Sequence, residues 1–64
     1  MNTEILKQAE LIGANCRINN IKAAAQSVEC MQLIKEHGNT LKIVDAFNKG
    51  WHNKHNELTP FNFN

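Results

Sequence analysis

Residues 38–53 read GNTLKIVDAFNKGWHN, and this stretch decides the fold. Gly38 favours the end of one helix, and the Asn39-Thr40 pair favours the start of the next. At about 100° per residue, the apolar side chains that follow fall in one arc and the polar ones lie opposite. That arc contains Ile43, Val44, Ala46, Phe47, Gly50 and Trp51. The pattern predicts an amphipathic helix from about Leu41 to Asn53, and Thr59-Pro60 ends any helix.

A second amphipathic helix is expected upstream, from about Thr3 to Arg17, with Asn2 or Thr3 as its N-cap. Its apolar arc consists of Ile5, Leu6, Ala9, Ile12, Gly13 and Cys16. The same spacing calls for an apolar residue near position 19 or 20, but Asn19 and Asn20 stand there. This interruption favours a turn or a sharp kink over the alternative, a single helix of about 35 residues with a polar layer.

The segment between these two helices predicts a third, from about Ile21 to His37, with Asn19 or Asn20 as its cap. Apolar side chains occupy two sides of this helix. They are Ile21, Ala23, Ala24, Ala25, Val28, Cys30, Met31, Leu33 and Ile34. A helix that is apolar nearly all round is normally buried on more than one face. A chain of 64 residues is too short to cover it alone.

The sequence therefore predicts an all-α fold of two or three short helices in a helical hairpin or small bundle. We expect homo-oligomerisation to complete it, most simply as a two-fold dimer. Residues 1–57 form the helical domain, and residues 58–64 form an extended C-terminal tail. The expected core is Ile5, Ala9, Ile12, Ile21, Ala25, Val28, Leu33, Ile34, Val44, Phe47 and Trp51. The expected oligomer interface is Leu11, Ile18, Ala24, Val28 and Met31.

Size and charge argue against several classes of protein. The chain has 64 residues, and its seven Lys/Arg and six Asp/Glu give a net charge of +1. It forms one domain at most and offers little shelter for catalysis, so we expect no enzyme. No apolar run reaches the roughly 18 residues of a membrane helix, and no signal peptide is recognisable at the N-terminus. We therefore expect a cytoplasmic protein without a membrane partner.

Two cysteines and three histidines are the candidate metal ligands and nucleophiles. His52 and His55 have a spacing that suits zinc, with Cys16, Cys30 and His37 as further ligands. No Cys-x-x-Cys pair accompanies them, so we expect no metal and no cofactor. In a hairpin that turns at residues 18–20, Cys30 would lie about 12 Å from Cys16 along the helix axis, beyond the roughly 7 Å limit for a disulfide. Free thiols are therefore expected.

Aromatic residues near the C-terminus are the sharpest candidates for a binding surface. Trp and Phe are enriched at interface hot spots, and flanking His side chains would form a polar rim. The expected partner-binding residues are Phe47, Trp51, His52, His55, Phe61 and Phe63. For Phe47 and Trp51 the alternative is a place in the core.

We therefore expect a non-catalytic inhibitor or adaptor that binds an unidentified protein through an apolar helical face. Size and style suit small accessory proteins of phages or mobile elements, although no motif matches one.

Two other functions stay open. A dimer could bind nucleic acid through Arg17, Lys42, Lys49 and Lys54, although the near-neutral charge provides no obvious basic face. An oligomer could instead hold a small ligand between its subunits, in a pocket lined by His37, His52 or His55.

Overall fold

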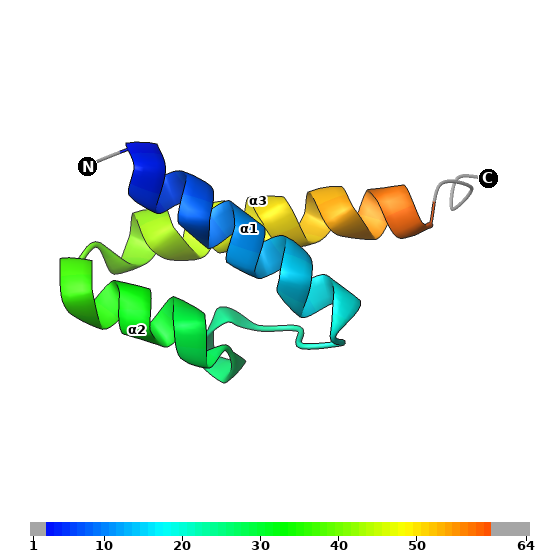
Figure 1. Ribbon diagram of the computed structural model, residues 1–64. Coiled ribbons are helices and arrows are strands. Elements are labelled where there is room, and N and C mark those ends of the chain that lie inside the picture. Colours follow the sequence, from blue (N-terminus) through cyan, green and yellow to red (C-terminus); the bar gives the residue numbers. More distant parts are fainter. Residues whose placement is uncertain (1–2, 60–64) are drawn as a thin grey trace.

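A computed structural model describes the chain from Thr3 to Thr59 (Figure 1). This part contains three α-helices, α1 (Thr3–Ile18), α2 (Val28–His37) and α3 (Thr40–Leu58), and one short 3-10 helix, η1 (Ala24–Gln26). Between residues 3 and 59 there is no strand, so the prediction of an all-α fold is confirmed.

The packing of α1 across α3 is the main contact of the fold. Figure 1 shows α1 crossing α3 at an angle, while α2 runs beneath the pair. After α1 the chain turns back before it enters α2, so α2 runs opposite to α1. The link between α2 and α3 is short and consists of Gly38 and Asn39.

Two glycines set the distance between α1 and α3. A Cβ atom added at Gly13 would lie 2.9 Å from the carbonyl carbon of Phe47 and closer still to its oxygen. A Cβ atom added at Gly50 would lie 2.6 Å from the carbonyl carbon of Glu10. Carbon atoms in contact normally stand about 3.5–4.0 Å apart. Both glycines stand in the predicted apolar arcs, and the structure shows that they let the two backbones touch.

The core lies between the three α-helices and η1. Its largest fully buried hydrophobic side chains are Phe47 and Ile43. The other buried hydrophobic residues are Ala9, Cys16, Ala24, Cys30, Leu33 and Ala46. The core prediction is confirmed for Ala9, Leu33 and Phe47. Six further predicted residues pack against this core while half-buried: Ile5, Ile12, Ile21, Ile34, Val44 and Trp51.

The core prediction is wrong for Ala25 and Val28, which are both exposed. α2 is apolar on two sides, and the side turned inward carries Cys30 and Leu33. Val28 therefore lies on the outside. Ala25 belongs to η1, so helical spacing does not decide its position.

α1 ends in a Schellman motif at Asn20. The Ile21 N–H donates to the Cys16 carbonyl at 2.7 Å, and the Asn20 N–H donates to the Arg17 carbonyl at 3.2 Å. Asn20 has a φ of 63°, a left-handed conformation that Asn adopts more readily than most residues. The predicted break is therefore confirmed, but Asn20 ends α1 instead of capping the next helix.

Residues 21–27 are not part of a helix that begins at Ile21, so the predicted start is wrong. Ala23 is extended, with φ −133° and ψ 146°, and η1 follows it. α2 begins after Ser27, whose hydroxyl oxygen accepts a hydrogen bond from the Cys30 N–H at 3.1 Å. Serine is a strong N-cap residue. The helix propensity of the alanines is overridden because Ala24 packs into the core from η1.

The other two helix ends follow familiar rules. Gly38 ends α2 with a φ of 73°, as predicted, and its N–H donates to the Ile34 carbonyl at 2.7 Å. α3 is longer than predicted and includes Leu58. The Thr59 N–H and hydroxyl both donate to the His55 carbonyl, at 3.0 and 2.8 Å. The predicted tail lies outside the described residues from Pro60 onward.

Cys16 and Cys30 are free thiols, and both belong to the buried core. Burial raises the pKa of the Cys30 thiol, and the neighbouring Cys16 adds to the rise. The expected separation of about 12 Å assumed a helical hairpin. The extended segment after α1 instead brings α2 back so that both thiols share one core.

Candidate binding surfaces

Three of the predicted partner-binding residues form one cluster on α3. Trp51 and His55 lie one helical turn apart, and their rings stack with centroids 5.3 Å apart and planes 13° from parallel. The His52 ring meets Trp51 edge-on, with centroids 5.1 Å apart and an interplanar angle of 75°. The structure therefore brings together Trp51, His52 and His55.

Trp51 is held in one orientation by a hydrogen bond to the segment that follows α1. Its Nε1–H donates to the Ile21 carbonyl oxygen at 2.8 Å, and the ring is half-buried. Phe47, one turn earlier, is completely buried, so its expected role in binding a partner is wrong. Its ring packs where α1 crosses α3 and has no exposed surface. Phe61 and Phe63 lie outside the described residues.

Arg17 from the last turn of α1 completes this cluster. Its Nε–H donates to His55 Nδ1 at 2.9 Å, and its guanidinium carbon lies 5.6 Å from the centre of the Trp51 ring. That distance is suitable for a cation–π interaction. Because Nδ1 accepts a hydrogen bond, the neutral His55 ring carries its proton on Nε2. Among the histidine contacts of the described chain, this one joins the two longest helices.

An open pocket of about 380 Å³ lies beside the cluster. Its lining residues are Arg17, Asn20, Lys22, Trp51 and His55. Between Thr3 and Thr59, neither Arg17 nor Lys22 has a carboxylate within ion-pair distance. The pocket therefore has a surplus of positive charge. Asn20 and Lys22 were not predicted as site residues, because the helix expected from Ile21 hid the turn that brings them here.

A second surface is the outward side of α2. Val28 is 79% exposed and Met31 is 45% exposed, and Ile34 is half-buried beside them. These three residues, with Gln32 and Lys35, line a shallow groove of about 540 Å³. We call this surface the α2 groove.

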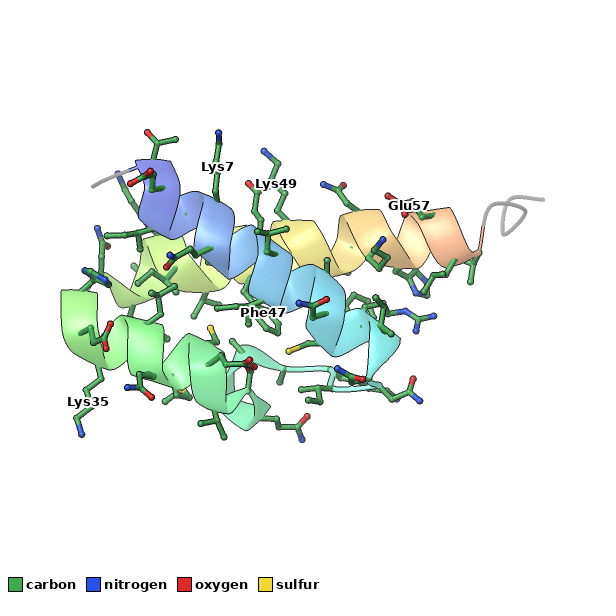
Figure 2. The ribbon with its side chains drawn as sticks, viewed as in Figure 1. Lys7, Lys35, Phe47, Lys49 and Glu57 are labelled. Atoms are coloured by element: carbon green, nitrogen blue, oxygen red, sulfur yellow. The ribbon has the colours of Figure 1, made fainter. Side chains whose placement is uncertain are left out.

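The five residues of the expected oligomer interface do not form one patch. Val28 and Met31 line the α2 groove, but Ala24 is buried in the core. Leu11 is 66% exposed and lines a different groove with Lys7 and Glu57. Figure 2 shows Lys7 and Glu57 on one side of the molecule and Lys35 on the opposite side. Ile18, at the end of α1, is 55% exposed.

The basic residues expected to contact nucleic acid are interleaved with carboxylates. Lys49 Nζ lies 3.9 Å from a carboxylate oxygen of Glu10, and Lys54 Nζ lies 2.9 Å from one of Glu57. Lys42 shares a surface hollow with Asp45 and Glu10. Phosphate binding needs an unopposed basic surface, and of the four residues only Arg17 is without a nearby acid in the described chain.

The candidate metal ligands are spread over several places. His52 and His55 flank Trp51, the two cysteines lie in the core, and His37 lies 3.9 Å from Glu36 at the end of α2. Within residues 3–59, no three His, Cys, Asp or Glu side chains are grouped closely enough to hold a metal ion. The three histidines expected to line a small-ligand pocket are not together either. Of the three, only His55 lines the pocket beside Trp51.

Comparison with protein-family models, with curated proteins and with solved structures finds no match to this chain. In the described part of the chain, none of the helices has the length and apolar character needed to traverse a bilayer.

Proposed function

We propose that the protein is a non-catalytic binding protein, an inhibitor or adaptor, that docks an acidic amphipathic segment of another protein in the α2 groove. The observation that carries this proposal is the exposure of Val28 and Met31 on a helix whose opposite side already fills the core. Val28, Met31 and Ile34, at positions i, i+3 and i+6, give the groove an apolar lining, and a hydrophobic groove is the surface into which an amphipathic helix lays its apolar face.

Burying this surface would be favourable. Full burial of an aliphatic side chain is worth about 1.5–3 kcal/mol relative to its exposed state. Since Val28 is 79% and Met31 45% exposed, covering both would contribute about 2–4 kcal/mol before the cost of association. That amount suits a modest affinity, which a larger partner surface would increase.

Lys35 favours a different protein over a second copy of this chain as the occupant. It lines the groove next to Val28 and Met31. The acidic residues of α2, Glu29 and Glu36, lie about 100–120° round the helix from Lys35. A second copy that presented the same face would bring no carboxylate of its α2 to Lys35, whereas an acidic segment would.

The test is a selection of helical peptides from a displayed random library, with the full-length protein as bait. The selected peptides are synthesised and their affinities are measured against four proteins. These are the wild type, the double variant Val28→Thr/Met31→Gln, the charge variant Lys35→Gln and the control Leu11→Gln. Leu11 is a suitable control because it is an exposed aliphatic residue on the opposite side of the molecule.

We expect selected peptides with two or three apolar anchors and at least one Asp or Glu. The double variant should weaken binding by about tenfold or more and Lys35→Gln by several-fold, while Leu11→Gln leaves affinity unchanged. Equal losses for the Leu11 variant, or the absence of any selected peptide, would overturn the proposal. Sedimentation of the wild type tests the other occupant: a dimer that the double variant converts to monomer would assign the groove to a second copy.

A further inference from the structure

We propose that the pocket lined by Arg17, Asn20, Lys22, Trp51 and His55 binds a small organic oxyanion, with a phosphate or carboxylate group joined to an apolar or planar body. We call it the Trp51 pocket. It lies on different elements from the α2 groove, so the two proposals stand or fall separately.

Unopposed positive charge is the first reason. The carboxylates of Glu10 and Glu57 lie beside Lys49 and Lys54, and Glu36 lies beside His37. Arg17 and Lys22 keep their charges without such a partner in the described chain. Glu4 lies in the first turn of α1, about 20 Å along the helix axis from Arg17, so it cannot neutralise the pocket. An oxyanion would supply the missing counter-charge.

Two of the donors at the pocket, those of Arg17 and His55, are fixed before any ligand arrives. Arg17 uses its Nε–H on His55, which leaves the Nη groups, the pair suited to two oxygens of one oxyanion. His55 is held by that bond and by stacking on Trp51, and its Nε2–H is a further donor. Lys22 adds a second positive charge from the extended segment. Binding therefore requires little ordering of Arg17 and His55, and only the exposed Lys22 side chain has to be ordered.

Trp51 gives the pocket an apolar wall. Its indole N–H is already satisfied by the Ile21 carbonyl, so the part of the ring that lines the pocket meets a ligand through its carbon atoms. A volume of about 380 Å³ lies at the lower end of the range for small-molecule sites. The combination of a flat apolar wall and two cations fits a small aromatic phosphate or carboxylate better than a bare inorganic ion.

The test uses the fluorescence of Trp51, which is the chain's sole tryptophan and lines the pocket itself. Trp51 is excited at the red edge of the indole absorption band. Its emission is followed while the full-length protein is titrated with phenyl phosphate, benzoate, inorganic phosphate or benzyl alcohol. Phenyl phosphate and benzoate compare the two kinds of oxyanion. Inorganic phosphate lacks the aromatic ring, and benzyl alcohol lacks the charge.

Variants assign the signal to the pocket. Lys22→Gln removes one charge and none of the hydrogen bonds of the described structure, so it should still fold. Arg17→Gln removes the other charge together with the His55 contact. Lys49→Gln is the matched control, since its side chain is 69% exposed and lies outside the pocket. Urea unfolding of each variant shows whether the fold is retained.

We expect a saturable change with phenyl phosphate or benzoate, weaker binding of inorganic phosphate and no saturation with benzyl alcohol. Lys22→Gln and Arg17→Gln should each weaken binding by about tenfold, as loss of a charge-assisted contact predicts, and Lys49→Gln should leave it unchanged. No saturation with either aromatic anion, or equal losses in the Lys49 variant, would overturn the proposal. Loss in Arg17→Gln alone, with Lys22→Gln unchanged, would also overturn it, because the proposed charge pair would then be absent.

Discussion

Replacement of Gly13 with alanine should destabilise the protein, against the usual effect of this substitution in a helix. In an exposed helix interior, Gly→Ala stabilises by about 1 kcal/mol because alanine has the higher helix propensity. At Gly13 the new Cβ atom would lie 2.9 Å from the Phe47 carbonyl carbon and 3.0 Å from the Trp51 nitrogen. Both are backbone atoms, so no side-chain rotation can relieve the contact.

The size of the effect follows from the distance that the helices must move. The shortest contact of the new Cβ atom is with the Phe47 carbonyl oxygen, so α1 and α3 must separate by at least about 1 Å, and a gap of about 0.5–1 Å already loses a quarter to a half of the dispersion energy across it. Overpacking of this kind costs about 1–3 kcal/mol, and a backbone clash belongs at the upper end. After subtraction of the propensity gain, we expect Gly13→Ala to lower the free energy of unfolding by about 2 kcal/mol.

Urea unfolding followed by far-ultraviolet circular dichroism measures this change. With a slope near 1 kcal/mol per molar urea for a chain this small, the midpoint should fall by about 2 M. Asn48→Ala is the matched control, because Asn48 is an exposed interior position of α3 and should gain about 0.5 kcal/mol. A Gly13→Ala midpoint equal to or above that of the wild type would refute the close crossing of α1 and α3.

Three further predictions concern the segment between α1 and α2 and the first turn of α2. Ser27→Ala should lower the free energy of unfolding by about 1 kcal/mol in urea titrations, because the Cys30 N–H loses its capping acceptor in a buried place. Asn20→Gly should leave the free energy of unfolding unchanged or raise it slightly. Asn20→Val should lower it by about 1–2 kcal/mol, because a β-branched residue resists a φ of 63°. Equal thermal midpoints for the two variants would contradict the Schellman motif. Burial raises the pKa of Cys30, so the folded protein keeps this proton above pH about 8.5, where an unfolded thiol loses it. The free energy of unfolding should therefore fall as the pH rises above that value, with a steeper slope than in Cys30→Ala, and identical slopes would rule out the raised pKa.

Local signals in the sequence were sufficient for α1 and for most of α3. α1 begins at the predicted residue and ends one residue after the predicted end, because Asn19 and Asn20 interrupt its apolar arc. α3 begins at Thr40, directly after Gly38, which ends α2, and Asn39, which is the N-cap of α3. Its longer C-terminal end was missed because residues 54–58 continue the helix without apolar periodicity. The Lys54–Glu57 ion pair and the Thr59 cap support that last part instead.

The close contact of α1 and α3 is harder to predict, because it depends on two residues far apart in the chain. Gly13 and Gly50 each look like a small member of an apolar arc. Only their juxtaposition shows that each accommodates the backbone of the other helix. A single sequence carries no information on which glycine meets which helix.

The misplaced start of α2 explains why Asn20 and Lys22 of the Trp51 pocket were not predicted. In a helix that began at Ile21, the Ile21 carbonyl would accept the N–H of residue 25 and be unavailable to Trp51. In the structure that carbonyl accepts the Trp51 indole N–H at 2.8 Å instead. The same extended residues place Lys22 at the pocket, and the left-handed turn at Asn20 brings them there from the end of α1. The turn that ends α1 and the turn that builds the pocket are therefore one feature, and a variant that straightened it into a helix should lose both Trp51 anchoring and anion binding.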